Sequence, residues 1–172
     1  MSRRYRVTAL VGDLATENDA ARLARSHATV KQIITGTVCP LEWAMVRHAL
    51  DDWNLNQLDF LFIENVGNLV CPSSYDLGED MRFVLLSVTE GEGKPLKYPP
   101  IFNRADVAAI TKVAPATAVE FDEAVTGRKI QALRPRMEVF TLSAKMREGM
   151  AEYLGFLERW YTARRAVAGV SK

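Results

Sequence analysis

Short apolar runs rich in β-branched residues alternate with helical patterns along this chain, and that alternation limits the fold more than any other feature. The expected strands are Tyr5–Val11, Val30–Ile34, Phe60–Val66, Phe83–Val88, Val107–Thr111 and Glu138–Leu142. Several of these runs are apolar throughout, as in strands that are covered on both faces. The pattern predicts an α/β fold with a mostly parallel sheet and helices on both faces, rather than a sandwich or a bundle.

Helices are expected between the strands, where apolar residues recur at helical spacing. Their expected starts are an acidic capping box at Thr16, the proline Pro40 with Cys39 as N-cap, Phe121 and about Arg147. The last two are expected to end at Leu133 and Arg165. The stretch Glu90–Pro100 holds two glycines and three prolines, and it is expected to be an exposed loop.

The composition predicts one globular domain over residues 1–172. The 22 Lys and Arg residues nearly balance the 21 Asp and Glu residues, for a formal net charge of +1. This balance argues against a nucleic-acid partner held by bulk charge. No apolar run approaches the roughly 18 residues of a membrane span, so no membrane partner is expected. Two cysteines do not make the disulfide framework of a secreted domain, and a cytoplasmic location is expected.

Longer segments carry a resemblance to a known family. They are GDLATENDA (residues 12–20), ITGTVC (34–39), FIENVGNLVCPSSYDLGED (62–80), LLSVTEGEGKPLKYPP (85–100) and SAK (143–145). In this order they resemble the hydrogenase nickel-incorporation GTPases, HypB, from about Arg6 to Gly149. The resemblance implies a dimeric P-loop GTPase fold of the SIMIBI type that uses GTP and Mg²⁺ to control delivery of Ni(II). The implied partners are nickel-delivery proteins and the large subunit of [NiFe]-hydrogenase.

The nucleotide machinery of that family is incomplete in this sequence. A P-loop needs G-x-x-x-x-G-K-[ST], so that backbone N–H groups, Lys and a hydroxyl hold phosphates and Mg²⁺. The 172 residues contain no such run, and they begin at the family's second strand. Where the family reads guanine with Asn-Lys-x-Asp, this chain has Thr111-Lys112-Val113-Ala114, and a methyl group accepts no hydrogen bond.

The resemblance leaves a remnant of the nucleotide site. Lys112 and the run Ser143, Ala144, Lys145 match the guanine pocket. Asp13 and Glu64 match acidic positions near Mg²⁺ and the switch segments. Both follow or end apolar strands, where ligands of parallel sheets gather. If the resemblance is set aside, the sequence alone favours a helix-capping or loop role for each of these carboxylates. GTP hydrolysis by this chain alone is therefore not expected.

Cys39 and Cys71 are the expected metal ligands. Two isolated cysteines are usually small buried hydrophobes, but the family binds Ni(II) or Zn(II) with a Cys-His pair and a second Cys. Pro40 stands in place of that His, so each protomer keeps two thiolates and a symmetric dimer offers four. Four thiolates favour tetrahedral Zn(II), or square-planar Ni(II) at a higher cost in geometry.

Three functions remain open at this point. The chain is a metal-binding HypB-type accessory protein without its own nucleotide machinery; or it is part of an active GTPase whose P-loop segment is encoded upstream or supplied by another chain; or it is a paralogue that pairs with a full-length HypB and binds no metal. In the family, the strand before the P-loop lies between those matching Phe60–Val66 and Phe83–Val88. We expect these two strands to pair directly, or to recruit a strand from another chain.

Overall fold

The structure is a computed structural model of the chain. It describes residues 1–13, 23, 26, 28–36, 41–67, 69–70 and 75–170. The chain divides into two compact units, Met1–Glu79 and Asp80–Lys172. Among the described residues, no helix is both long and apolar enough to cross a membrane. The helix expected at Thr16 lies outside the described residues.

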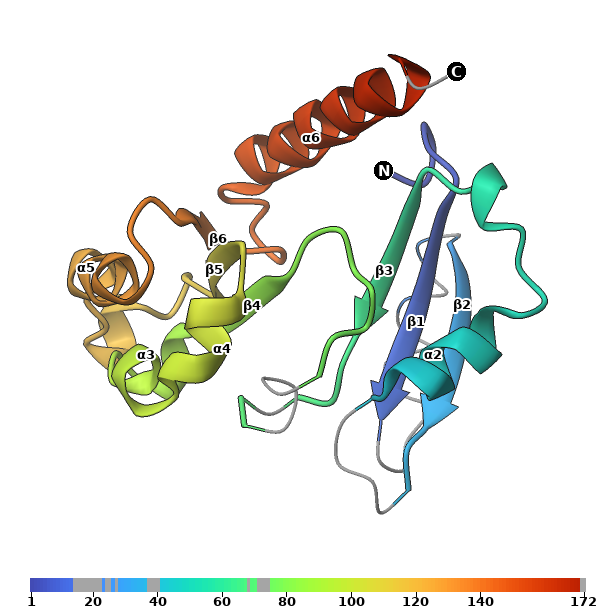
Figure 1. The fold of residues 1–172 in the computed structure, drawn as a ribbon. Helices are drawn as coiled ribbons and strands as arrows, with labels where there is room; N and C mark the ends of the chain where they lie inside the picture. The colour runs from blue at the N-terminus through green and yellow to red at the C-terminus, as the bar shows by residue number, and fades with distance from the viewer. Residues whose placement is uncertain are drawn as a thin grey trace. The chain divides into compact units, whose positions relative to one another are not determined.

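The first unit is built on a parallel sheet in the order β2-β1-β3 (Figure 1). Its strands are β1 (Val7–Asp13), β2 (Thr29–Ile34) and β3 (Phe60–Glu64). A 3-10 turn, Leu55–Gln57, precedes β3. The helix α2 (Trp43–Leu50) buries Val46 and Ala49 in one cluster with Leu10 and Leu41. The centre of this unit is therefore the middle strand β1 with α2 against it.

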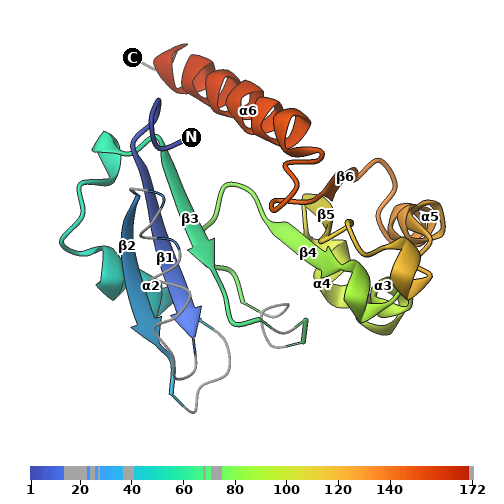
Figure 2. The same ribbon diagram turned by 180° about the vertical axis from the view of Figure 1, so that it is seen from behind.

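The second unit is built on a parallel sheet in the order β4-β5-β6 (Figure 2). Its strands are β4 (Phe83–Ser87), β5 (Val107–Thr111) and β6 (Glu138–Leu142). Its helices are α3 (Lys94–Lys97), α4 (Pro99–Arg104), α5 (Glu123–Leu133) and α6 (Met150–Val170), with 3-10 turns at Val88–Glu90 and Thr117–Val119. Two buried clusters, around Leu86 and Ile110 and around Ala109 and Phe140, lie on opposite faces of the sheet. Both units confirm the expected α/β class.

The first turns of α6 cover the second of these faces with aromatic side chains. The ring of Tyr153 lies edge-on to Phe83 and Phe140, with centroids 5.7 and 5.6 Å away. Phe156 lies 5.2 Å from Phe140 in the same cluster. Burial raises the pKa of Tyr153 above its ordinary value of 10.0, because the phenolate loses its hydration there.

Each expected strand is present, with shifts at some ends. β5 and β6 have the expected bounds. β1 begins at Val7 and ends at Asp13, two residues later than expected at each end. β3 ends at Glu64 because the Asn65 side chain accepts a hydrogen bond from the Val66 N–H at 2.8 Å and turns the chain there.

The expectation that Pro40 opens a helix with Cys39 as its N-cap is wrong. α2 begins at Trp43, and its N-cap is Glu42, whose backbone is extended. The cause is a tertiary contact: the Leu41 N–H donates to Asn65 Oδ1 at 2.9 Å, while the Leu41 side chain is fully buried. The helices expected from Phe121 and Arg147 begin at Glu123 and Met150 instead.

The expectation of an exposed loop over Glu90–Pro100 is also wrong. The helix α3 occupies Lys94–Lys97, and α4 begins at Pro99. Proline is well tolerated in the first turn of a helix because the N–H that it lacks has no partner there. Pro95 is fully buried, so this segment is part of the folded second unit.

Two strands were expected to pair directly or to recruit a strand from another chain, and they correspond to β3 and β4. β3 and β4 belong to different sheets, and each is an edge strand of its own sheet. Both possibilities, direct pairing of these edges and recruitment of a strand from another chain, stay predictions.

Candidate functional site

In the first unit, the two expected acidic residues lie at the carboxyl ends of adjacent strands. Asp13 is the last residue of β1 and Glu64 the last residue of β3. Val11 is directly opposite Glu64, so Asp13 extends two residues beyond it along the same edge. The Asp13 carbonyl accepts a hydrogen bond from the Thr35 N–H at 3.0 Å. Carboxylates at such an edge are suitable ligands for a hard cation such as Mg²⁺.

The described residues contain no group of three or more His, Cys, Asp or Glu side chains that could hold a metal ion. Asp13 and Glu64 would therefore act with ligands from outside this set, such as phosphate oxygens or water.

A contact that the sequence analysis missed connects the loops after β2 and β3. Asn65 Oδ1 accepts hydrogen bonds from the backbone N–H groups of both Leu41 and Val66, at 2.9 and 2.8 Å. A Cβ on Gly12 would lie only 2.5 Å from Leu41 Cγ, so a glycine is needed where Leu41 packs on the end of β1. Asn65 directly follows an expected strand, and this position is the one feature of the sequence that points to Asn65 as a residue of the site.

The two expected metal ligands, Cys39 and Cys71, lie outside the described residues. Leu41, which Asn65 holds, follows Cys39 by two positions, and Cys71 follows Asn65 by six. The Ni(II) or Zn(II) site on these thiols stays a prediction.

In the second unit, the guanine-pocket remnant gathers at the carboxyl ends of β5 and β6. Thr111 pairs with Leu142, so Lys112 and Ser143 follow neighbouring strands at the same level. Lys112 is exposed and has a left-handed backbone with φ of 59°. A residue other than glycine in this region is often found at functional sites. The structure thus brings together Lys112 and the run that begins at Ser143.

The run Ser143, Ala144, Lys145 forms one side of a closed loop. The Ser143 N–H donates to the Glu148 carbonyl at 3.0 Å, and Ser143 Oγ accepts from the Met146 N–H at 3.3 Å. Ser143 is buried, whereas Ala144 and Lys145 are exposed. The buried serine therefore fixes the loop that presents the two exposed residues.

Where the resemblance places a guanine-reading aspartate, the structure has an exposed alanine, Ala114. Its neighbour Val113 is buried, and the Val113 N–H donates to the Leu142 carbonyl at 3.4 Å. The segment after β5 is thus held against β6 without a carboxylate that could accept hydrogen bonds from guanine. A site that lacks this partner loses discrimination by orders of magnitude.

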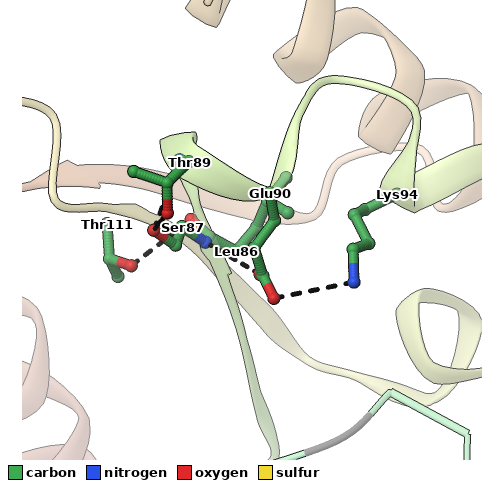
Figure 3. A network of polar contacts seen from close by, with 6 residues as sticks. All are labelled: Leu86, Ser87, Thr89, Glu90, Lys94 and Thr111. Carbon is green, nitrogen blue, oxygen red and sulfur yellow. Dashed lines mark hydrogen bonds and ion pairs between the residues drawn. The ribbon is translucent and has the colours of Figure 1, made fainter. Parts of the chain in front are cut away.

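A polar network that the sequence analysis did not identify lies at the end of β4 (Figure 3). Ser87 Oγ lies 2.8 Å from Thr89 Oγ1, and Glu90 Oε2 accepts from the Ser87 N–H at 3.3 Å (Figure 3). Lys94 Nζ lies 3.6 Å from Glu90 Oε1. Thr111 Oγ1 donates to a β4 carbonyl at 3.4 Å. Ser87 and Glu90 form a capping box at the start of the 3-10 turn, and the whole network fixes the backbone between β4 and α3 beside the remnant.

Known proteins of one family resemble this chain over most of its length. The family model described as the CobW/HypB/UreG nucleotide-binding domain matches residues 1–141. Hydrogenase maturation factor HypB of Rhizobium leguminosarum bv. viciae is 43% identical over 164 residues, which is 95% of this chain and 54% of that protein. A probable hydrogenase maturation factor HypB of Methanocaldococcus jannaschii is 40% identical over 156 residues, 91% of this chain and 71% of that protein.

Two solved structures have the same fold. The crystal structure of HypB from Helicobacter pylori in complex with nickel has a TM-score of 0.88 and 39% identity, over 94% of this chain and 77% of that one. The HypB structure from Archaeoglobus fulgidus has a TM-score of 0.85 and 36% identity, over 93% of this chain and 78% of that one. This chain spans about half the length of the Rhizobium relative. With an α/β fold of the P-loop GTPase type and these matches, the chain belongs to the HypB family.

Proposed function

We propose that this chain is a HypB-type accessory protein that binds nickel and delivers it to a [NiFe]-hydrogenase, without hydrolysing GTP by itself. The observation that carries this proposal is the similarity to a HypB structure in complex with nickel, with a TM-score of 0.88 over 94% of this chain. In this proposal Ni(II) is the cargo, and the partners are nickel-delivery proteins and the hydrogenase large subunit.

The proposed ligands are the thiolates of Cys39 and Cys71. Two thiolates fill half of a four-coordinate shell, so the site is completed by the same residues of a second copy in a homodimer, or by a full-length HypB in a heterodimer. The hydrogen bond from Leu41 to Asn65 supports this pairing, since it joins the segment after Cys39 to the segment before Cys71. Zn(II) is the alternative metal, because four thiolates suit its tetrahedral geometry.

Two features support the proposal that the chain does not hydrolyse GTP by itself: the lack of a P-loop run in the sequence and the composition of the guanine-pocket remnant in the second unit. The 172 residues contain no P-loop run, and Ala114 replaces the guanine-reading carboxylate. Lys112, Ser143, Ala144 and Lys145 offer two exposed lysines and one buried serine, and these groups do not form the run of backbone N–H groups that cradles a triphosphate. The carboxylates Asp13 and Glu64 are then left without a phosphate-bound Mg²⁺.

Equilibrium dialysis against Ni(II), followed by metal analysis and sedimentation, tests the proposal. We expect one metal ion per dimer in the unaltered chain and loss of that metal in both Cys39→Ser and Cys71→Ser. His48→Ala is the matched control, because the His48 side chain is 90% exposed and contacts Asp51. One tightly bound metal per monomer, or metal retained in Cys39→Ser, would overturn the shared site.

A second candidate function is a complete GTPase whose P-loop segment is supplied upstream or by another polypeptide. The observation that favours it is the pair of edge strands, β3 and β4, which have no strand on their second side among the described residues.

A further inference from the structure

Three cationic side chains gather at the carboxyl ends of β5 and β6. Lys112 follows β5 directly, and Lys145 and Arg147 lie in the loop that follows β6. Thr111 and Leu142 are register partners, and neighbouring strands lie about 4.8 Å apart, so the two segments leave the sheet side by side. We name this region the basic loop surface, which consists of Lys112, Lys145, Met146 and Arg147.

The cations of the basic loop surface are not neutralised within the described part of the chain. All three are exposed, and none forms a salt bridge or a side-chain hydrogen bond with a described residue. An acidic neighbour, Glu148, is also exposed, and its backbone carbonyl accepts from Ser143. Three cations against this carboxylate leave an excess of positive charge. Other cations of the same unit are paired with carboxylates: Lys94 with Glu90, Lys129 with Glu92 and Arg134 with Asp106.

The backbone of the basic loop surface is fixed from beneath. The buried Ser143 donates through its N–H to the Glu148 carbonyl at 3.0 Å, and its Oγ accepts from the Met146 N–H at 3.3 Å. Lys112 and Arg147 both have left-handed backbones, with φ of 59° and 61°, which residues with a Cβ rarely adopt. The backbone that carries the cations is therefore ordered before a ligand binds, and this lowers the entropy cost of binding.

The side chains of this surface suit an acidic protein segment. A guanidinium such as that of Arg147 can donate two parallel hydrogen bonds to one carboxylate. Met146 is 64% exposed among the cations, and a flexible methionine is a common contact at peptide-binding surfaces. A nucleic acid is a poorer match, because the surface has no aromatic ring on which a base could stack and three cations are fewer than the roughly six to ten phosphate contacts of DNA sites.

We infer that the basic loop surface docks an acidic segment of a partner protein, meaning an extended stretch with several Asp or Glu side chains. The inference gives the remnant at the ends of β5 and β6 a role in holding a partner. It depends neither on the cysteines nor on nickel. Metal binding without peptide binding, or peptide binding without metal binding, would therefore separate it from the proposed function.

The test titrates the full chain into a fluorescein-labelled peptide in which about six glutamates flank one leucine, and it measures fluorescence anisotropy at about 0.05 M salt, where charges are weakly screened. We expect saturable binding, and none to the same peptide with glutamine in place of glutamate. Arg147→Gln should weaken the binding about threefold. The triple variant Lys112→Gln, Lys145→Gln, Arg147→Gln should weaken it about tenfold or more.

Arg136→Gln is the matched control. Arg136 is also an exposed arginine with a left-handed backbone, at φ of 68°, but it precedes β6 and so lies at the other end of that strand. Its replacement changes the net charge as Arg147→Gln does, and binding should stay unchanged. Equal weakening by the two variants would show an effect of net charge alone and would overturn the inference.

Hydrogen exchange of the β5 amides establishes that each variant is folded, and Arg147→Gln decides the outcome if the triple variant is not. Full binding by a folded triple variant would refute the docking surface, and so would equal binding of the glutamine peptide. Tighter binding of a single-stranded oligonucleotide with the same number of charges would refute the acidic segment as the occupant.

Discussion

Gly149 joins β6 to α6, and its replacement by alanine tests how the second unit is closed. Its φ is +66°, in the left-handed region. A Cβ built there would overlap the Thr141 carbonyl oxygen and lie 3.2 Å from Leu142 Cδ2. The first of these contacts is with backbone, which cannot move aside without shifting β6. The substitution therefore adds both conformational strain and a steric overlap.

Each of the two effects has a known size. A left-handed backbone costs about 1–2 kcal/mol for a residue with a Cβ. Relief of the overlap would move the chain beside the 3.0 Å hydrogen bond from Ser143 N–H to the Glu148 carbonyl, and a lost hydrogen bond costs about 1 kcal/mol. We expect Gly149→Ala to lower the free energy of unfolding of the second unit by about 3 kcal/mol.

Native-state hydrogen exchange of the β5 amides, Val107–Thr111, reports this free energy for the second unit by itself. Gly127→Ala is the control: Gly127 lies inside α5, and a Cβ there would meet nothing within 4 Å. That change should stabilise the same unit by about 0.5–1 kcal/mol, the usual gain of alanine over glycine in a helix. If Gly149→Ala cost less than about 1 kcal/mol, the reasoning on strain and overlap would be refuted.

Three further outcomes are expected. Burial raises the pKa of Tyr153, so the neutral phenol contributes its full stability below the unfolded pKa near 10.0. This contribution is lost as the pH rises through the higher pKa of the folded state. Urea unfolding between about pH 8 and 11 should show the loss in the unaltered chain and not in Tyr153→Phe. Pro40→His should raise the affinity for Ni(II) in a competition assay with a coloured chelator, since imidazole is a good nickel ligand, and unchanged affinity would count against the Cys39 site. Isothermal titration of the chain at about 100 µM with Mg-GTP should give no binding heat, whereas micromolar affinity for GTP over ATP would contradict the loss of the nucleotide site.

The strands were predictable because their signal is local. Val107–Thr111 and Glu138–Leu142 have the expected bounds, since each apolar run fits a strand between polar residues. The start of β1 depends on a contact between distant residues. The Arg6 N–H donates to Asp59 Oδ2 at 2.8 Å before β1 begins, and no pattern near Arg6 indicates that bond.

The helices were less predictable, because proline signals both a loop and a helix start. Pro95 and Pro99 lie in the first turns of α3 and α4, where the sequence argument placed a loop. The sequence pattern predicts a helix start at Pro40, but the Leu41 N–H bonds to Asn65 and the backbone of Glu42 is extended, so the helix begins at Trp43.

Of the candidate site, sequence and resemblance selected residues that the structure places at strand ends. Asp13 and Glu64 share one edge, and Lys112 and Ser143 share another. The sequence shows only that Asn65 follows a strand, because its hydrogen bond with Leu41 and the left-handed backbone of Lys112 both depend on the folded arrangement of neighbouring loops.

The order of strands in the two sheets has a consequence for how each unit folds. In the second unit, β4, β5 and β6 are neighbours in the sheet in the same order as in the chain. In the first unit, β1 lies in the middle, and its pairing with β3 joins residues as distant as Val7 and Phe60. Closing a longer loop costs more entropy before any contact forms, and folding slows as the mean separation of contacting residues rises. The second unit should therefore reach its native sheet before the first, while β1 and β3 are still unpaired.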